Sequence, residues 1–75
     1  MEKFPERLRR LREKDRPVKS MKITSELIGL GSNTLRRYER GEREPGLTEL
    51  KMIAKHYHVS LDELCWDEEE REDNL

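Results

Sequence analysis

The segment TLRRYERGEREPGL, residues 34–47, constrains the fold of this chain more than any other stretch. A basic run passes through an aromatic residue and stops at Gly41, and a charged turn closed by Pro45 precedes a new apolar period at Leu47. This order predicts that one helix ends, the chain turns, and a second helix begins. Four arginines fall within eight residues on this helix end and turn, where they suit a phosphate-lined groove: Arg36, Arg37, Arg40 and Arg43.

Apolar residues elsewhere recur at the 3.6-residue period of helices, and no stretch of useful length alternates as a strand does. With 32% apolar and 44% charged residues among 75, the chain can bury only a small core. We therefore predict an all-α fold, a compact bundle of five helices. The predicted helices run from Phe4 or Pro5 to Lys14, from the cap Ser20 to Gly29, from Gly31 and Ser32 to about Arg40, from residues 45–47 to near His58, and over a short stretch after the cap Ser60.

The same period predicts which side chains face the core. Leu35 and Tyr38 are expected to point inward from the third helix, and Leu30 is expected to fill the turn before it. The other residues expected to face inward are Phe4, Leu8 and Leu11 in the first helix, Ile23, Leu27 and Ile28 in the second, Leu47, Leu50, Ile53, Ala54 and Tyr57 in the fourth, and Leu61 and Leu64 in the fifth.

The net charge of −1 conceals a strong asymmetry along the chain. Residues 1–43 carry 13 Lys/Arg against 7 Asp/Glu, a net charge of +6, whereas residues 44–75 carry 3 against 10, a net charge of −7. The cationic N-terminal part can bind a polyanion in one orientation, because the electrostatic field near that part of the protein controls the encounter. The pI of about 6.1 therefore does not exclude nucleic acid as a partner.

Other classes of protein find no support in the sequence. No run approaches the ~20 apolar residues of a membrane span, and residues 1–10 are too charged for a secretory signal, so we expect a cytoplasmic protein. The single cysteine, Cys65, excludes an internal disulfide, and His56 and His58 would lie on different helix faces, so no metal site is expected. No paired carboxylates, Ser/Cys–His set or phosphate-binding glycine loop indicates an enzyme or a cofactor.

The second and third predicted helices are joined by only about three residues around Gly29 and Leu30, and such a short joint forces a steep angle between them. Three further segments carry recognisable patterns: RLRRLRE at 7–13, TLRRYERGEREP at 34–45 and LKMIAKHYHVSLDEL at 50–64. Together with the turn, these segments resemble the phage repressor/Cro-type helix-turn-helix domains, the XRE family.

The resemblance implies a lambda-repressor-like five-helix domain over residues 1–66 that binds double-stranded DNA through its third helix, usually as a homodimer on a two-fold operator. It also implies a sequence-specific transcriptional regulator, a repressor of prophage or mobile-element type. Residues 67–75 are expected to be an acidic, disordered tail. The alternative from another class is a protein-interaction module, such as an antitoxin or anti-repressor, that grips a partner through Cys65, Trp66 and the acidic end.

The resemblance also assigns roles to individual residues. Asparagine can form two hydrogen bonds with adenine, arginine can form two with guanine, and serine can hydrogen-bond to either base. For the arginines, contact with phosphate is the alternative. The turn after the third helix and the start of the second helix would hold backbone phosphates. The implied base contacts are Ser32, Asn33, Arg36 and Arg37. The expected phosphate contacts are Lys19, Ser20, Lys22, Thr34, Arg40, Gly41 and Arg43, with capping of the helix as the alternative for Thr34.

Two departures separate this chain from the family pattern. Met21 stands where a glutamine commonly contacts phosphate, and Lys19 and Lys22 are expected to substitute for it. Thr24 and Ser25 stand where a Leu-Ala pair is usual, and the link between the first two helices is about two residues longer than usual.

Structural roles compete with DNA contact at several charged positions. Glu39 is expected to bond within the domain, and the arginines of the first helix are expected to form its solvated face. Trp66 either closes the core or lies in a dimer contact. Arg40 and Arg43 alternatively pair with one of three carboxylates, namely Glu39, Glu42 or Glu44.

Overall fold

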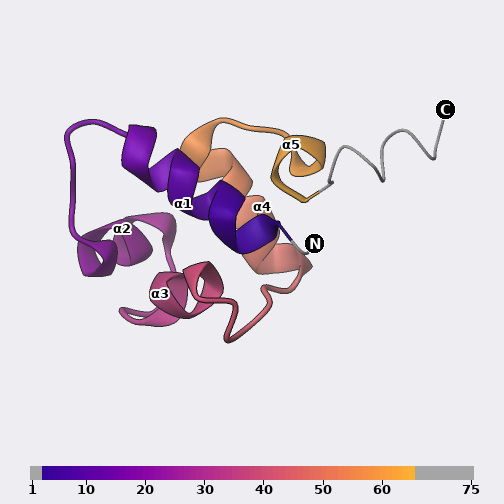
Figure 1. The fold of residues 1–75 in the computed structure, drawn as a ribbon, viewed down its shortest axis with the longest axis horizontal. Helices are drawn as coiled ribbons and strands as arrows, with labels where there is room; N and C mark the ends of the chain where they lie inside the picture. The colour runs from indigo at the N-terminus through magenta and orange to yellow at the C-terminus, as the bar shows by residue number, and fades with distance from the viewer. Residues whose placement is uncertain (1–2, 66–75) are drawn as a thin grey trace, which may run out of the picture.

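The computed structural model describes residues 3–65, and over this range the chain forms five helices and no strand (Figure 1). The predicted all-α fold of five helices is confirmed. In Figure 1, α2 and α3 form an adjoining pair below α1, and α5 lies toward the other end of the molecule. The helices are α1 (Phe4–Lys14), α2 (Met21–Ile28), α3 (Thr34–Glu39), α4 (Leu47–Tyr57) and α5 (Leu61–Cys65).

Local signals in the sequence set the starts of α2 and α5 and the end of α2 where they were expected. The Ser20 hydroxyl accepts from the backbone N–H of Ile23 at 3.1 Å, which caps α2. The Ser60 hydroxyl accepts from the backbone N–H of Glu63 at 3.0 Å, and the Glu63 carboxylate accepts from the Ser60 backbone in return. Gly29 ends α2 in the left-handed conformation, with φ of +103°.

One small core joins all five helices. α1 packs against α3 and α5, α2 packs against α3 and α4, and α4 packs against α5. As a result α3 is supported from behind by both α1 and α2, and its outer side is left open. The buried residues of this core are Phe4, Leu8, Ile28, Leu35, Tyr38, Ile53, Ala54 and Leu64.

The predicted inward face of α2 is wrong at two of its three positions. Ile23 is 50% exposed and Leu27 is 57% exposed, whereas Thr24 and Ser25 are buried beside Ile28. Apolarity alone favoured the wrong side of the helix, because hydroxyl groups can be buried when they find partners nearby. Thr24 finds such a partner, since its hydroxyl donates to the Ser20 carbonyl at 2.9 Å.

Two other expectations also need correction. α3 begins at Thr34 and not at Gly31 or Ser32, because the chain first makes a turn that the Thr34 N–H closes onto the Gly31 carbonyl at 3.1 Å. Leu47 is 60% exposed, since it is the first residue of α4 and the buried side of that helix begins further along. Leu50 is half-buried and packs against the core.

Ser25 ties α2 to the start of α3. Its hydroxyl donates to the Gly31 carbonyl and accepts from the buried backbone N–H of Leu35 at 3.2 Å. The residue directly before α3, Asn33, makes no capping hydrogen bond with its own side chain. A side chain from the neighbouring helix therefore satisfies an amide in the first turn of α3, a group that would otherwise be buried without a partner.

We expect Gly29→Ala to lower the free energy of unfolding by about 1–2 kcal/mol, because a residue with a Cβ is strained at this positive φ. The added Cβ would also lie 2.7 Å from Met52 Cε, so that side chain would have to shift. Gly31→Ala is the comparison variant in the same turn, since Gly31 does not have positive φ and its added Cβ would meet only a side-chain oxygen, Thr34 Oγ1, at 3.0 Å. Urea denaturation of both variants checks this prediction, and equal stability of Gly29→Ala and the wild type would contradict it.

Candidate nucleic-acid interface

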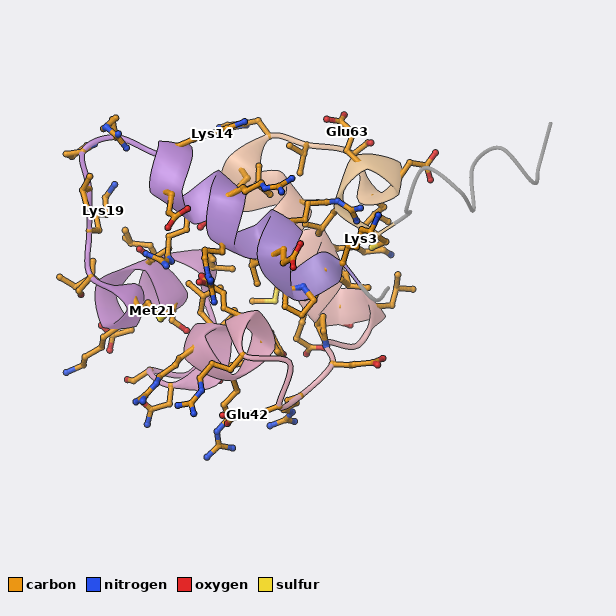
Figure 2. The ribbon with its side chains drawn as sticks, in the orientation of Figure 1. Lys3, Lys14, Lys19, Met21, Glu42 and Glu63 are labelled. Atoms are coloured by element: carbon orange, nitrogen blue, oxygen red, sulfur yellow. The ribbon has the colours of Figure 1, made fainter. Side chains whose placement is uncertain are left out.

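α3 has a buried side and an exposed side with different chemistry. Leu35, Tyr38 and Glu39 are buried against the rest of the domain, whereas Arg36 and Arg37 are exposed. Figure 2 shows nitrogen-tipped side chains projecting from α3 and the following turn, away from α1. The pattern of the sequence produces this division, because the apolar residues of α3 fall on one side and the cations on the other.

The four candidate base-contacting residues lie together at this exposed edge. Ser32 and Asn33 occupy the turn that leads into α3, and Arg36 and Arg37 follow within the first turns of the helix; all four are exposed. A surface hollow of about 250 Å³ is formed at this edge by five residues, namely Asn33, Arg36, Arg37, Arg40 and Glu42. The structure therefore brings candidate base and phosphate contacts to one hollow with three arginines.

The alternative prediction that Arg40 pairs with a nearby carboxylate is confirmed, and the partner is Glu42. Arg40 Nε lies 2.8 Å from Glu42 Oε2, and both side chains are about half exposed. An ion pair this exposed contributes little to stability, so a phosphate can replace the carboxylate at small cost. The pair leaves Arg40 at the rim of the hollow, next to the turn that Gly41 closes with φ of +71°.

The candidate phosphate contacts fall in two groups, one at the start of α2 and one that runs from the first residue of α3 to the turn after it. Lys19, Ser20 and Lys22 lie at the start of α2, and Figure 2 labels Lys19 and Met21 there, away from the turn that holds Glu42. The Lys19 ammonium donates to the Pro17 carbonyl at 3.2 Å, and its Nζ lies 3.9 Å from Asp15 Oδ2. The second group is Thr34, Arg40, Gly41 and Arg43. Of these, Thr34 and Arg43 line a separate hollow of about 360 Å³, which residues of α4 also line.

Glu26 also reaches this edge, which the sequence did not indicate. The Ser32 hydroxyl donates to Glu26 Oε2 at 3.1 Å, across the turn between α2 and α3. The two residues are six apart and belong to different elements, so no helical spacing relates them. Only knowledge of where α2 ends and α3 begins could have identified this pair.

On the buried side of α3, Glu39 forms an ion pair with Arg12 of α1. Glu39 is 2% exposed and accepts from Arg12 Nε at 2.7 Å and from a terminal nitrogen of Arg12 at 3.0 Å. The hydrogen bond to Glu39 raises the pKa of Arg12, while burial acts in the opposite direction. Arg9 lies 4.0 Å from the same carboxylate. The predicted structural role of Glu39 is confirmed.

The expectation that the arginines of α1 form a solvated face is wrong for at least two of them. Arg12 bridges α1 to α3 through Glu39, and only 20% of its side chain is exposed. Arg7 donates to the Leu64 carbonyl at 2.9 Å, which connects α1 to α5. Both arginines were indistinguishable in the sequence from their exposed neighbours Arg9 and Arg10, because the partners lie far away along the chain.

The remaining candidate groups do not form a second site in the described part of the chain. Burial raises the pKa of the half-buried Cys65 thiol, which keeps the sulfur protonated and a poor nucleophile. His56 packs edge-on against the Tyr57 ring, with 4.7 Å between centroids.

Within residues 3–65 there is no cluster of three potential metal ligands, and no helix there is long and apolar enough to cross a membrane. Trp66 and residues 67–75 lie outside the described residues.

Two comparisons with known proteins found matches. A family model described as a helix-turn-helix matches residues 19–64, which include α2, α3 and α4. The HTH-type transcriptional regulator AnsR of Bacillus subtilis (strain 168) is 34% identical over 53 residues, which are 71% of this chain and 46% of that protein. The chain thus spans about half the length of the curated relative it matches. No solved structure matches.

Proposed function

Because this chain belongs to the XRE-type helix-turn-helix family, we propose that it is a DNA-binding transcriptional regulator that reads its target with α3. One observation carries the proposal: the exposed edge of α3 is cationic and hollowed, while its back is held by Glu39, Leu35 and Tyr38. A rigid short helix with an open polar side is what major-groove reading requires.

The two groups of candidate phosphate contacts extend this proposal. In it, residues at the start of α2 and after α3 hold the backbone on the two sides of the groove, which sets the register of α3. Ser32, Asn33, Arg36 and Arg37 then meet base edges. Phosphate contacts supply most of the affinity, and the base contacts supply the sequence preference.

The finer features of the proposal concern assembly and biological role. One helix-turn-helix covers only a few base pairs, so two copies spaced one helical turn apart would supply the missing affinity and specificity. We propose a homodimer on a two-fold operator that acts as a repressor of prophage or mobile-element type. The DNA-binding domain would cover residues 1–66, followed by an acidic tail at 67–75. The protein would work in the cytoplasm, without a cofactor or catalytic activity.

The salt dependence of binding tests the electrostatic part of this proposal. We expect the logarithm of the association constant to fall linearly with the logarithm of salt concentration, with a slope of roughly −0.9 per phosphate contact. Lys22→Ala and Arg43→Ala should each make the slope shallower by about one, and should weaken binding to selected and random duplexes equally. Fluorescence anisotropy titrations between low and moderate salt give these slopes.

Lys55→Ala provides the matched control for these two variants. Lys55 is exposed near the end of α4, outside the proposed interface, so its removal should leave the slope unchanged. An affinity that stays flat as salt rises, or a Lys55→Ala variant that changes the slope as much as Lys22→Ala, would refute the proposed electrostatic contact.

A further inference from the structure

The hydrogen bond between Ser32 and Glu26 places a carboxylate at the proposed reading edge. Glu26 lies in the second half of α2 and Ser32 lies in the turn before α3, and both side chains are exposed. The Ser32 hydroxyl donates its proton to Glu26 Oε2 over 3.1 Å. Asn33, which directly follows Ser32, lines the hollow with Arg36 and Arg37, so under the proposed function the pair lies beside the surface that would face DNA.

The pair changes what the Ser32 hydroxyl can recognise. A serine hydroxyl has one proton to donate and two lone pairs that accept, and it rotates to suit its surroundings. An ionised carboxylate only accepts, and hydrogen bonds to such a charged group are roughly twice as strong as neutral ones. While the hydroxyl hydrogen of Ser32 is engaged in the hydrogen bond to Glu26, the Ser32 oxygen can act toward a base only as an acceptor.

We propose that Glu26 is a specificity-determining positioning residue that makes Ser32 select a base with an amino group in the major groove. Adenine and cytosine present an amino donor there, whereas guanine presents only acceptors and thymine presents an acceptor and a methyl group. At the base that faces Ser32, adenine or cytosine is therefore favoured over guanine or thymine. The inference rests on the proposed function, because it deepens the account of how α3 reads DNA.

Glu26 also has an electrostatic effect with the opposite sign. A carboxylate close to the phosphate backbone repels it, so the same residue that sharpens base preference weakens binding to every duplex. Removal of Glu26 is expected to raise affinity for non-cognate DNA and to reduce discrimination at one base position. Unfolding of the domain would instead lower all affinities, so the two effects together distinguish the proposed role from a general loss of structure.

The test begins with the full chain and a duplex site selected from a random pool. Each base pair of the selected half-site is then replaced in turn, and competition titrations measure the ratio of affinities for amino-bearing and keto-bearing bases on one strand. For the wild type we expect a ratio of about tenfold at one position, the upper range for one hydrogen bond. For Glu26→Ala we expect about twofold or less there, with non-cognate affinity raised several-fold.

Two further variants separate charge from hydrogen bonding. Glu26→Gln removes the charge and keeps an acceptor in place, so it should raise non-cognate affinity and retain more of the base ratio than Glu26→Ala. Glu63→Gln is the matched control, because Glu63 also accepts from a serine hydroxyl, that of Ser60 at 3.2 Å, but lies on α5 away from α3 (Figure 2). Glu63→Gln should change neither the ratio nor the non-cognate affinity.

The outcomes that overturn the inference are distinct from failure of the proposed function. If Glu26→Ala raises non-cognate affinity but keeps every base ratio, Glu26 acts only as a charge. If Glu26→Ala still changes the ratio in a Ser32→Ala background, Glu26 acts without Ser32; an unchanged ratio there supports the inference. A wild type that selects no sequence at all would refute the proposed function itself.

Discussion

Arg12→Ala is expected to destabilise the domain by about 3–5 kcal/mol, which is a large part of the stability that a domain of this size possesses. The variant leaves the carboxylate of Glu39 in the interior without its two hydrogen bonds from Arg12. A buried charge without a partner is costly because water cannot reach it. Arg9, at 4.0 Å and half exposed, replaces only part of the lost interaction.

Urea denaturation followed by circular dichroism measures this effect. Arg10→Ala is the matched control, because Arg10 is an exposed arginine on the same helix and its loss should change stability by no more than about 0.5 kcal/mol. Replacement of both partners, in an Arg12→Leu and Glu39→Leu double variant, should recover most of the loss, since no unpaired charge remains. The assignment fails if Arg12→Ala is no less stable than Arg10→Ala.

The second large effect is expected at the DNA. An Asn33→Ala and Arg37→Ala double variant should bind its selected duplex roughly 100-fold more weakly, since each good base contact contributes about 1–3 kcal/mol. Binding to random duplexes should fall much less, because only the charge of Arg37 is lost there. Both residues are exposed, so the free energy of unfolding should stay within about 0.5 kcal/mol of the wild type.

This double variant also separates the two classes of function. Competition titrations with selected and scrambled duplexes give the specific and non-specific affinities side by side. An Arg10→Ala variant, which removes an exposed arginine from α1, serves as the control for loss of charge alone. If the double variant binds its selected duplex as tightly as the wild type, α3 does not read bases, and a role as a protein-interaction module becomes the better account.

The helix boundaries were largely predictable because single residues set them through local chemistry. Ser20 and Ser60 cap helices with their own side chains, and Gly29 tolerates the positive φ that ends α2. The start of α3 was placed too early, since Ser32 and Asn33 suit both a turn and a helix start. The resemblance nevertheless placed both among the base contacts, and both are exposed at the edge of α3.

Contacts between distant residues were not predictable from the pattern. The burial of Thr24 and Ser25 in place of Ile23 and Leu27 depends on hydrogen-bond acceptors, which hydrophobic periodicity does not consider. Thr24 donates to the Ser20 carbonyl at the start of α2, and Ser25 donates to the Gly31 carbonyl in the turn before α3. The bonding of Glu39 within the domain was expected, but its partner was not. Arg12 is 27 residues away, and one arginine of α1 looks like another until the angle between α1 and α3 is known.

The attachment of α3 to α2 through Ser25 bears on any attempt to exchange specificity between relatives. α3 has only six residues, too few to remain helical in water without support, and an amide of its first turn is held by a hydroxyl from outside it. A chimaera that imports only those six residues would detach them from their anchor and alter their tilt. The transferable cassette is therefore the whole stretch from Ser20 to Gly41.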